Sequence, residues 1–255
     1  MPNIKYICDV NEAIDFIFPD LFNNNLDNDN SGSNTNKIKT NSAILCATNK
    51  YVDEWNAKIQ SLNSNKSHTL LSLDRFDCVD DNKDILKGMI NEEVLNRYND
   101  VSVPPHNLIL KEDDICFIMR NLLKKDGLTN NTRVKIVKIQ KYSIRVCTID
   151  SSIAKVFTIP RIYFKVSLPY GRGFTMIRKQ FPLRLAYSMT YNKSQGQELY
   201  KCLVDIRSPP FVHGHLYVAL SRIKFYNNIR IFCSEENIDN NAIILKNYFY
   251  ELLKI

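Results

Sequence analysis

Apolar runs and polar turns alternate along the last third of the chain. Leu185 to Met189 is a short apolar run with small residues, which predicts a buried strand of a parallel sheet, and Cys202 to Ile206 predicts a second strand. Gly214 to Ile223 has the spacing of an amphipathic helix. Between the strands, Ser194 and Gln197 stand in S-x-x-Q form, which predicts a capping box. A helix that begins there would offer free backbone N–H groups to a phosphate.

The first hundred residues show a second series of elements. Ala43 to Thr48 predicts a strand, and Tyr51 to Ile59 predicts a helix with Trp55 in the core. Asn23 to Asn41 is rich in asparagine and poor in apolar residues, which predicts a disordered loop or linker. A further helix is expected at Asn91 to Tyr98.

The middle of the chain, from Leu108 to Val166, changes to short β-branched runs separated by turns. These runs are Ile115 to Met119, Arg133 to Ile139, Ser143 to Ile149 and Lys155 to Ile159. Short consecutive strands joined by tight turns are typical of a small antiparallel barrel.

Two segments carry a resemblance to a known family. AYSMTYNKSQGQEL resembles motif V, and HGHLYVALSRI resembles motif VI, of the Pif-type DNA helicases (petite integration frequency family), superfamily 1 motors that also occur in rolling-circle transposons. The segments IDFIFPDLF, AILCATNKYVDEWN, VPPHNLILK, FIMRNLLKKDGLTNNTRVKIV and FTIPRI resemble further blocks of that family's C-terminal half, in the same order. The similarity covers roughly Asn11 to Glu236.

The resemblance implies an α/β fold: the second RecA-like lobe of a motor, built on a parallel sheet, with a small SH3-like antiparallel β barrel inserted into it. The expected segments are 1–40 with the Asn-rich linker, 41–107 as the first part of the lobe, 108–167 as the barrel, 168–236 as the second part with motifs V and VI, and 237–255 as a helical tail. Asn131 stands where the family usually has glycine, and asparagine tolerates a left-handed backbone better than most residues.

The family's functional residues map onto individual positions of this sequence. Arg222 matches the arginine that reaches the terminal phosphate of ATP as an arginine finger, although a helix-end role explains an arginine there as well. The residues expected nearer the nucleotide are Gln195, Gly196, Gln197 and Glu198. The residues expected near the DNA backbone are Thr190, Asn192 and Lys193, with Arg161, Arg178 and Lys179 as further candidates for phosphate contacts or ordinary surface cations.

Phosphoryl transfer needs a glycine-rich loop with Lys and Ser/Thr, and an acidic residue that holds Mg²⁺. No G-x-x-x-x-G-K-[ST] occurs in these 255 residues. ATP and Mg²⁺ are therefore expected only together with the missing first RecA-like lobe, in cis or in trans, and the chain alone is expected not to hydrolyse ATP. His215 in place of the family's usual glutamine, and Glu112 to Ile115 in place of a glycine-containing turn, are further departures.

Charge and composition indicate which binding partners and cofactors to expect. The net charge is +7, and residues 151–232 hold thirteen Lys/Arg against Glu198 and Asp205, a balance of +11 that leaves −4 for the remainder. A basic half suggests a polyanion, here single-stranded DNA, although an ordinary solvated surface has the same composition. The seven cysteines form no C-x-x-C pair, and His213 and His215 lack a third ligand nearby, so neither a disulfide framework nor a metal site is expected.

Three functions compete at this stage. The first is the C-terminal part of an ATP-dependent DNA helicase, for which the family implies roles in DNA repair, recombination and telomere maintenance. The second is a non-enzymatic DNA-binding remnant of a transposon helicase, and the third is a generic SH3-like interaction module. Acidic residues near the N-terminus and the absence of a long apolar run argue against a signal peptide and a membrane span. An intracellular protein is expected, in the nucleus or in mitochondria.

Overall fold

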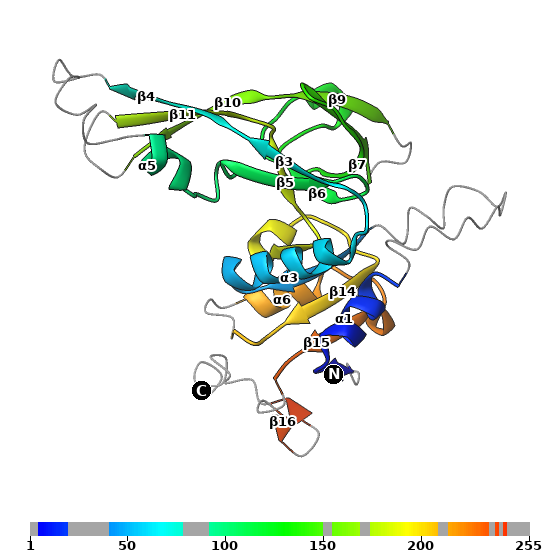
Figure 1. Ribbon diagram of the computed structural model, residues 1–255. Helices are drawn as coiled ribbons and strands as arrows, with labels where there is room; N and C mark the ends of the chain where they lie inside the picture. The colour runs from blue at the N-terminus through cyan, green and yellow to red at the C-terminus, as the bar shows by residue number, and fades with distance from the viewer. Residues whose placement is uncertain are drawn as a thin grey trace. The chain divides into compact units, whose positions relative to one another are not determined.

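The computed structural model describes residues 5–19, 41–78, 92–149, 155–168, 174–208, 214–234, 238–239 and 242–243 (Figure 1). The chain divides into two compact units. Unit 1 comprises residues 1–62 and 186–255, and unit 2 comprises residues 63–185. Unit 2 is therefore a continuous insertion into unit 1, and it is longer than the predicted barrel segment of 108–167.

Unit 1 is built on a five-stranded sheet in the order β1-β15-β14-β2-β13. The strands are β1 (Tyr6–Ile7), β15 (Ile229–Phe232), β14 (Lys201–Asp205), β2 (Ser42–Cys46) and β13 (Ser188–Thr190). Every ladder between them is parallel. All five residues of β2 are buried, as expected for a central strand of a parallel sheet. The prediction of a mixed α/β fold with a parallel sheet is confirmed.

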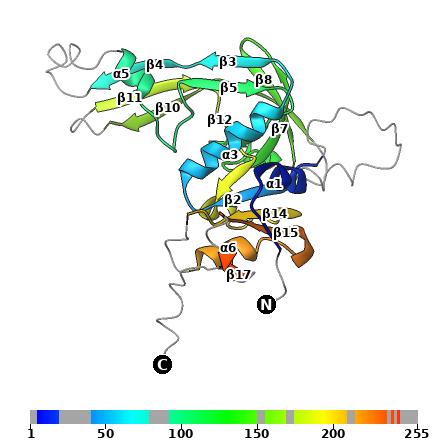
Figure 2. The same ribbon diagram turned by 60° about the horizontal axis from the view of Figure 1, so that its bottom comes forward.

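Helices cover both faces of this sheet. Helices α1 (Val10–Ile17) and α3 (Asn49–Leu62) lie on one face, and α6 (His215–Leu220) lies on the other (Figures 1 and 2). The carboxylate of Asp9 accepts a hydrogen bond from the backbone N–H of Glu12 at 2.8 Å and so caps α1. Trp55 of α3 is 2% exposed and packs edge-to-face on Phe232, with ring centroids 5.0 Å apart, so its predicted core position is confirmed.

Unit 2 is largely antiparallel. One sheet has the order β12-β6-β7-β8-β9, a second has the order β10-β11-β4, and β3 pairs with β5. The first sheet consists of β12 (Leu183–Leu185), β6 (Ile115–Ile118), β7 (Arg133–Ile139), β8 (Ser143–Thr148) and β9 (Val156–Pro160). The other strands are β10 (Ile162–Ser167), β11 (Phe174–Gln180), β4 (Leu73–Cys78), β3 (Ser67–Leu71) and β5 (Asn107–Lys111). The four strands predicted in the middle of the chain correspond to β6–β9.

The described part of unit 2 contains a larger and a smaller apolar cluster. Leu110, Ile118, Val134, Ile144 and Phe181 belong to the larger cluster, which β5, β6, β7 and β8 surround. The smaller cluster joins β10 and β11 to α5 (Glu92–Arg97), which corresponds to the helix predicted at 91–98. Among the described residues, no ladder pairs β12 with β9, so barrel closure stays a prediction.

Three sequence predictions differ from the structure. The run Leu185 to Met189 is not one strand, because β12 ends in unit 2 at Leu185 and β13 begins in unit 1 at Ser188. The apolar run continues from one unit into the next because Leu183 is buried in unit 2 and Ala186, Tyr187 and Met189 are buried in unit 1. Ser194 does not begin an α-helix, since it closes the 3₁₀ turn η2 (Tyr191–Ser194) and Gly196, with φ of 80°, redirects the chain. The described part of the predicted helical tail is a strand pair, β16 (Ile238–Asp239) with β17 (Ala242–Ile243).

Other predictions are confirmed or lie outside the described part. Asn131 adopts φ of 66°, the left-handed backbone expected of a residue in the place of glycine. The helix predicted at 214–223 is present as α6, with its last turn shortened. Nearly all of the Asn-rich segment 23–41 lies outside the described residues, and so does His213.

Candidate nucleotide and nucleic-acid site

The carboxyl edge of unit 1's sheet holds the residues of this unit that were predicted to contact the DNA backbone. Because the strands are parallel, β13, β2 and β14 end at the same edge, where ligands of open α/β sheets bind. Thr190 is the last residue of β13 and is half-buried. The η2 turn follows it directly, with Asn192 exposed and Lys193 half-buried.

Two buried residues hold the η2 turn in place. The hydroxyl of Tyr191, which is 1% exposed, donates to the backbone carbonyl of Asp205 at the end of β14, at 2.9 Å. The Tyr191 ring also packs edge-to-face on His215 of α6, with centroids 5.9 Å apart. The Ser194 hydroxyl donates back to the Tyr191 carbonyl at 2.7 Å. These contacts leave Asn192 and Lys193 on the outer side of a fixed turn.

The segment 195–198 forms an irregular turn after η2. The side-chain amide of Gln197 donates to the carbonyl of Lys193 at 3.2 Å, and its backbone N–H donates to the carbonyl of Ser194 at 3.0 Å. The Glu198 carboxylate forms an ion pair with the ammonium of Lys224. Gln195 and Gly196 are exposed. The turn therefore offers polar groups to solvent from a backbone that is tied at both ends.

The same turn lies beside the segment that carries Arg222. The backbone N–H of Leu199 donates to the carbonyl of Arg222 at 2.9 Å, and Leu199 forms a parallel bridge with Ile223. The structure thus brings Arg222 and the predicted nucleotide segment together on unit 1. The Arg222 guanidinium donates to the Val218 carbonyl at 2.8 Å and to the Ser221 hydroxyl at 2.7 Å. Two of its five N–H groups are used in these bonds, and the side chain is partly exposed.

A charged cluster at the end of β14 was not predicted from the sequence. Asp205, which is 1% exposed, accepts a hydrogen bond from the indole N–H of Trp55 at 2.7 Å and forms an ion pair with Arg207 at 2.7 Å. Arg207 also pairs with Glu54 at 2.6 Å and lies over the ring of Tyr51, 4.3 Å from its centroid. Burial acts to lower the pKa of Arg207, but the hydrogen bonds to both carboxylates outweigh it and the pKa is raised. The spacing Asp-x-Arg after an apolar strand was the available signal.

Arg178 requires a correction. It is fully buried in unit 2 and forms an ion pair with Asp74 at 2.8 Å. Its remaining N–H groups donate to the carbonyls of Leu95, Tyr98 and Pro104 at 2.8–3.1 Å. With all five N–H groups engaged, the guanidinium has none for a phosphate. The prediction that Arg178 contacts the DNA backbone is therefore wrong for this structure.

The other two basic candidates of unit 2 have different surroundings. The Arg161 guanidinium lies 4.4 Å from the centroid of the Phe181 ring and donates to the Lys141 carbonyl at 3.2 Å, so it is largely a packing residue. The ammonium of Lys179 lies 5.2 Å from the centroid of the Tyr163 ring on a partly exposed sheet face. Of the two, Lys179 is the better placed for a phosphate.

Neither a metal cluster nor a membrane span is found in the described part of the chain. No group of three or more His, Cys, Asp or Glu side chains there is arranged to hold a metal ion. None of the described helices is long and apolar enough to cross a membrane.

Comparison with known proteins finds similarity to Pif1 helicases. No protein-family model matches the chain. The ATP-dependent DNA helicase Pif1 of Campylobacter jejuni is 31% identical over 127 residues, which are 48% of this chain and 27% of the helicase. The crystal structure of the Pif1 helicase of Candida albicans matches with a TM-score of 0.58 at 21% identity, over 82% of this chain and 48% of that one.

The chain resembles Pif1-type DNA helicases.

A second solved Pif1 helicase, from Bacteroides in complex with ADP-AlF3 and single-stranded DNA, matches with a TM-score of 0.54 at 18% identity, over 96% of this chain and 49% of that one. The Pif1 likeness confirms the predicted resemblance. At these identities the structural matches show the shared fold, a mixed α/β arrangement with a parallel sheet. The chain spans about a quarter of the Campylobacter Pif1 helicase and about half of each of the two solved Pif1 chains.

Proposed function

We propose that these residues are the C-terminal portion of a Pif1-type ATP-dependent DNA helicase, which binds single-stranded DNA and supplies Arg222 as the arginine finger. The observation that carries the proposal is the Leu199–Arg222 backbone bond. It sets Arg222 beside the segment 195–198 on the same unit that presents Asn192 and Lys193. In this proposal the DNA contact lies at the carboxyl edge of the sheet, after β13, and the nucleotide contact lies at the amino edge, where Glu198 and Leu199 precede β14.

The chemistry of the side chains suggests which residues contact DNA and which contact the nucleotide. Thr190, Asn192 and Lys193 offer hydroxyl, amide and ammonium donors that suit the phosphate oxygens of a DNA backbone. Gln195 to Glu198 and Arg222 lie toward the nucleotide, where a guanidinium stabilises charge that develops on the transferred phosphoryl group. ATP and Mg²⁺, when bound, supply the phosphoryl group and its counter-charge. Since these 255 residues contain no P-loop, ATP and Mg²⁺ are held jointly by this chain and a first RecA-like lobe, in cis or in trans.

Finer assignments belong to the same proposal. The parallel sheet of unit 1 is a second RecA-like lobe, and the sheet β12-β6-β7-β8-β9 is the SH3-like subdomain inserted into it. Roles in DNA repair, recombination or telomere maintenance are extensions of the family proposal. The Bacteroides Pif1 helicase that shares the fold was solved with single-stranded DNA and a nucleotide analogue, which supports both partners.

A second candidate function is a DNA-binding remnant without ATPase activity. It is favoured by His215 at the usual glutamine position of motif VI. His215 is 8% exposed and packs on Tyr191, so the substitution is accommodated as a core residue of α6.

Binding and turnover distinguish the candidates. Fluorescence anisotropy of the full chain with labelled oligo-dT, at several salt concentrations, should show sequence-tolerant binding that weakens steeply with salt. Lys193→Ala should reduce the salt slope by roughly 0.7 to 1 unit, and Lys58→Ala, an exposed lysine on α3, should leave it unchanged. DNA-stimulated ATP turnover after addition of a first lobe supports the helicase, whereas its absence supports the remnant. A chain that binds no DNA contradicts both.

A further inference from the structure

The three-stranded sheet of unit 2 has two faces of different character. Residues that pair across β10, β11 and β4 have their side chains on the same face of the sheet. Successive side chains along each strand point to opposite faces. One face holds Phe164, Met176 and Phe76, and α5 covers it. The opposite face, here called the outer face, consists of Tyr163, Lys165 and Ser167 on β10, Thr175, Ile177 and Lys179 on β11, and Leu73, Arg75 and Asp77 on β4.

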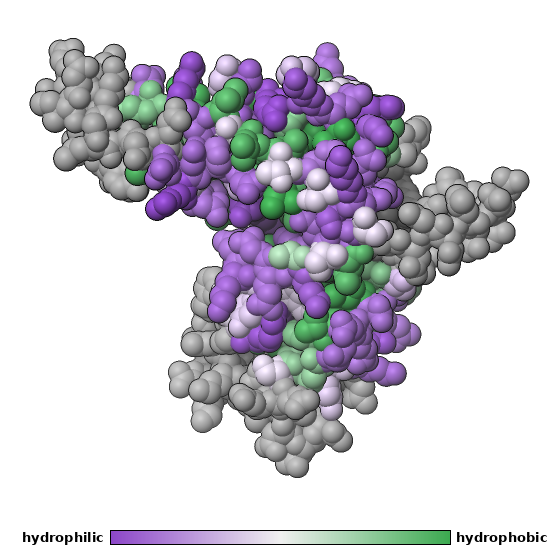
Figure 3. Space-filling model, viewed as in Figure 1, coloured by the Kyte–Doolittle hydropathy of each residue, from purple (hydrophilic) through white to green (hydrophobic). Residues whose placement is uncertain are grey.

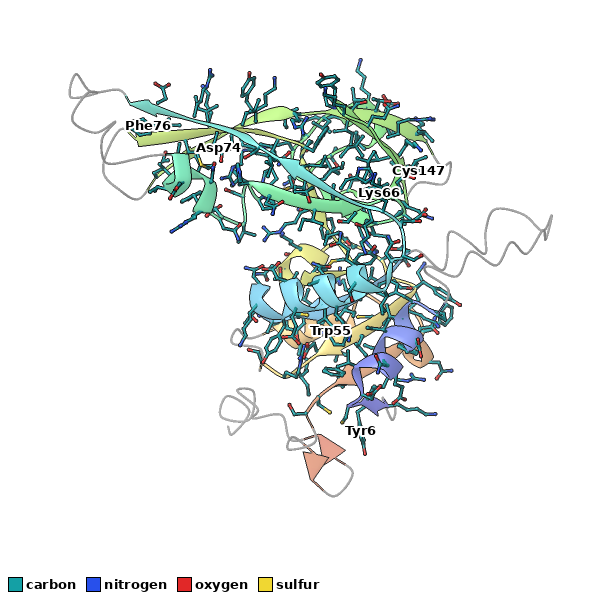
Figure 4. All side chains as sticks on the ribbon, in the orientation of Figure 1. Tyr6, Trp55, Lys66, Asp74, Phe76 and Cys147 are labelled. Atoms are coloured by element: carbon teal, nitrogen blue, oxygen red, sulfur yellow. The ribbon has the colours of Figure 1, made fainter. Side chains whose placement is uncertain are left out.

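The outer face is solvent-exposed and basic. Arg75, Lys165 and Lys179 face a single carboxylate, Asp77, and none of the three cations has a carboxylate partner among the described residues. In Figure 4, side chains project from the side of this sheet that is turned away from α5, and Asp74 and Phe76 mark strand β4. Figure 3 shows mainly hydrophilic residues on the visible side of unit 2, with hydrophobic patches between them. The face therefore suits an anion rather than an apolar partner.

An exposed aromatic ring stands among these cations. Tyr163 is 57% exposed, and it lies directly across the ladder from Lys179, whose ammonium is 5.2 Å from its ring centroid. The guanidinium of Arg75 is 5.5 Å from the same centroid. Arg75 begins on β4, two strands away, so its side chain crosses the middle strand near Ile177, which is only 4% exposed. Cationic side chains thus surround the ring and cover the apolar middle of the face.

We infer that the outer face is a binding surface for single-stranded nucleic acid, separate from the motor segments of unit 1. Tyr163 stacks on a base, and Arg75, Lys165 and Lys179 neutralise phosphates on either side of it. Exposed rings that alternate with cations are the general means by which proteins hold single strands without reading sequence. A protein-docking surface would instead have an apolar centre depleted of charge, whereas here Ile177 lies between Lys165 and Arg75, which have no carboxylate partner among the described residues.

Photocrosslinking of the full chain tests the contact directly. Oligo-dT and oligo-rU that carry 5-iodouracil are irradiated with the chain, and the crosslinked peptide is identified by mass spectrometry. The expected product is a crosslink at Tyr163. Crosslinking by both oligonucleotides means a general single-strand surface, and crosslinking by one of them identifies DNA or RNA as its ligand. If neither crosslinks within β10, β11 or β4, the proposal is overturned and the face is left for a protein partner.

Affinity measurements give an independent readout. Tyr163→Ala should weaken oligo-dT binding about 5-fold to 100-fold, and Tyr163→Phe should retain most of the affinity. Tyr142→Ala is the matched control, since Tyr142 is 73% exposed in the same unit and also lies beside a lysine, but in the β7–β8 turn. The double variant with Arg75→Ala and Lys165→Ala should lower the salt slope by roughly 1.4 units.

The outcome separates this inference from the proposed function. Binding that is weakened by Lys193→Ala but not by Tyr163→Ala overturns the inference and leaves the proposed function standing. Binding that is weakened by Tyr163→Ala but not by Lys193→Ala supports the inference and removes the motor-edge contact. Thermal melts of the Tyr163, Arg75 and Lys165 variants should match wild type, because these side chains are exposed on the sheet surface.

Discussion

Asp74 and Arg178 occupy directly opposed positions on β4 and β11, and their side chains form a buried ion pair of 2.8 Å. The pair lies on the α5 side of the sheet, where the guanidinium also holds three backbone carbonyls. One buried cation therefore joins two strands, a helix and the loop that ends at Pro104.

Removing Asp74, the carboxylate partner of this cation, should destabilise the fold. Asp74→Ala leaves a charged guanidinium buried without a counter-ion, so the free energy of unfolding should fall by about 3–5 kcal/mol. Asp74→Leu combined with Arg178→Met should recover only part of that loss, because it removes both buried charges but leaves the carbonyls of Leu95, Tyr98 and Pro104 without their donor. Urea unfolding measures both. If Arg178→Ala keeps full stability and weakens DNA binding, Arg178 is a nucleic-acid contact after all.

The Asp205 carboxylate should stabilise the fold through its contacts with Trp55 and Arg207. Asp205→Asn removes the ion pair and weakens the indole bond, and we expect a loss of about 3 kcal/mol in the free energy of unfolding. Trp55 is the single tryptophan of the chain, so its fluorescence reports this site alone. Asp15→Asn, on the exposed side of α1, is the control and should change the stability by less than about 0.5 kcal/mol. An unchanged emission spectrum in Asp205→Asn would contradict the proposed contact.

Arg222→Ala should affect turnover and spare the fold. Its two side-chain bonds at the end of α6 are partly exposed, so their loss should cost about 1 kcal/mol or less. In a protein where these residues follow a first RecA-like lobe, ATP turnover should fall about 10³-fold or more, with DNA affinity close to wild type. Arg230→Ala is the matched control, because Arg230 is also half-buried and also donates to backbone carbonyls. Equal losses in both variants would remove the arginine-finger assignment.

The left-handed backbone at Asn131 gives a simple stability prediction. Asn131→Gly should be neutral or stabilising by less than about 1 kcal/mol, because glycine adopts φ of 66° without a Cβ contact, and Asn131→Ala should destabilise by about 1 kcal/mol, because alanine keeps the Cβ and lacks the short polar side chain that lets asparagine tolerate this backbone. Thermal unfolding measures the difference. Asn130→Ala at the adjacent exposed position should change little, and equal effects at both positions would mean that backbone strain is not the cause.

Tyr191 should make the fold sensitive to alkaline pH. Burial, aided by nearby Cys46 and Asp205, raises the pKa of its phenol well above the ordinary value of 10.0. The unfolded chain loses this proton above about pH 10 while the folded chain keeps it, so stability is complete below that pH and falls as pH rises, by at most about 1.4 kcal/mol per unit. Urea unfolding from pH 9 to 11 should show a shallower decline for Tyr191→Phe than for wild type. Parallel declines would contradict the assignment.

Much of unit 1 could be predicted because its signals are local. The strand at β2, the helix around Trp55 and the strand at β14 follow from apolar runs and helical spacing that the tertiary structure did not override. The segments that resemble motifs V and VI could be located because their residues are consecutive. The edge that gathers Thr190 and Lys193 then follows from the parallel direction of the strands.

The rest depended on contacts between distant residues. Arg178 has the same local pattern as a surface cation, and its burial is decided by Asp74, 104 residues earlier. None of the individually predicted strands corresponds to β4, β10 or β11, because β4 and β11 carry charged residues on both faces and so lack the apolar alternation that indicates a strand. The capping box at Ser194 failed because Tyr191 and Gly196 fix a different turn, which the spacing of two residues cannot reveal.

The order of strands in unit 1 has a consequence for synthesis. Ile44 of β2 pairs with Ser188 of β13, and Tyr6 of β1 pairs with Ile231 of β15, whereas unit 2 is one continuous stretch. On a ribosome that adds 5–20 residues per second, β2 therefore waits roughly 7 to 30 seconds for its first neighbouring strand, while unit 2 can already fold. A strand that is wholly buried in the finished protein is exposed for that time, and it is the segment that a chaperone bound to the nascent chain would be expected to shield.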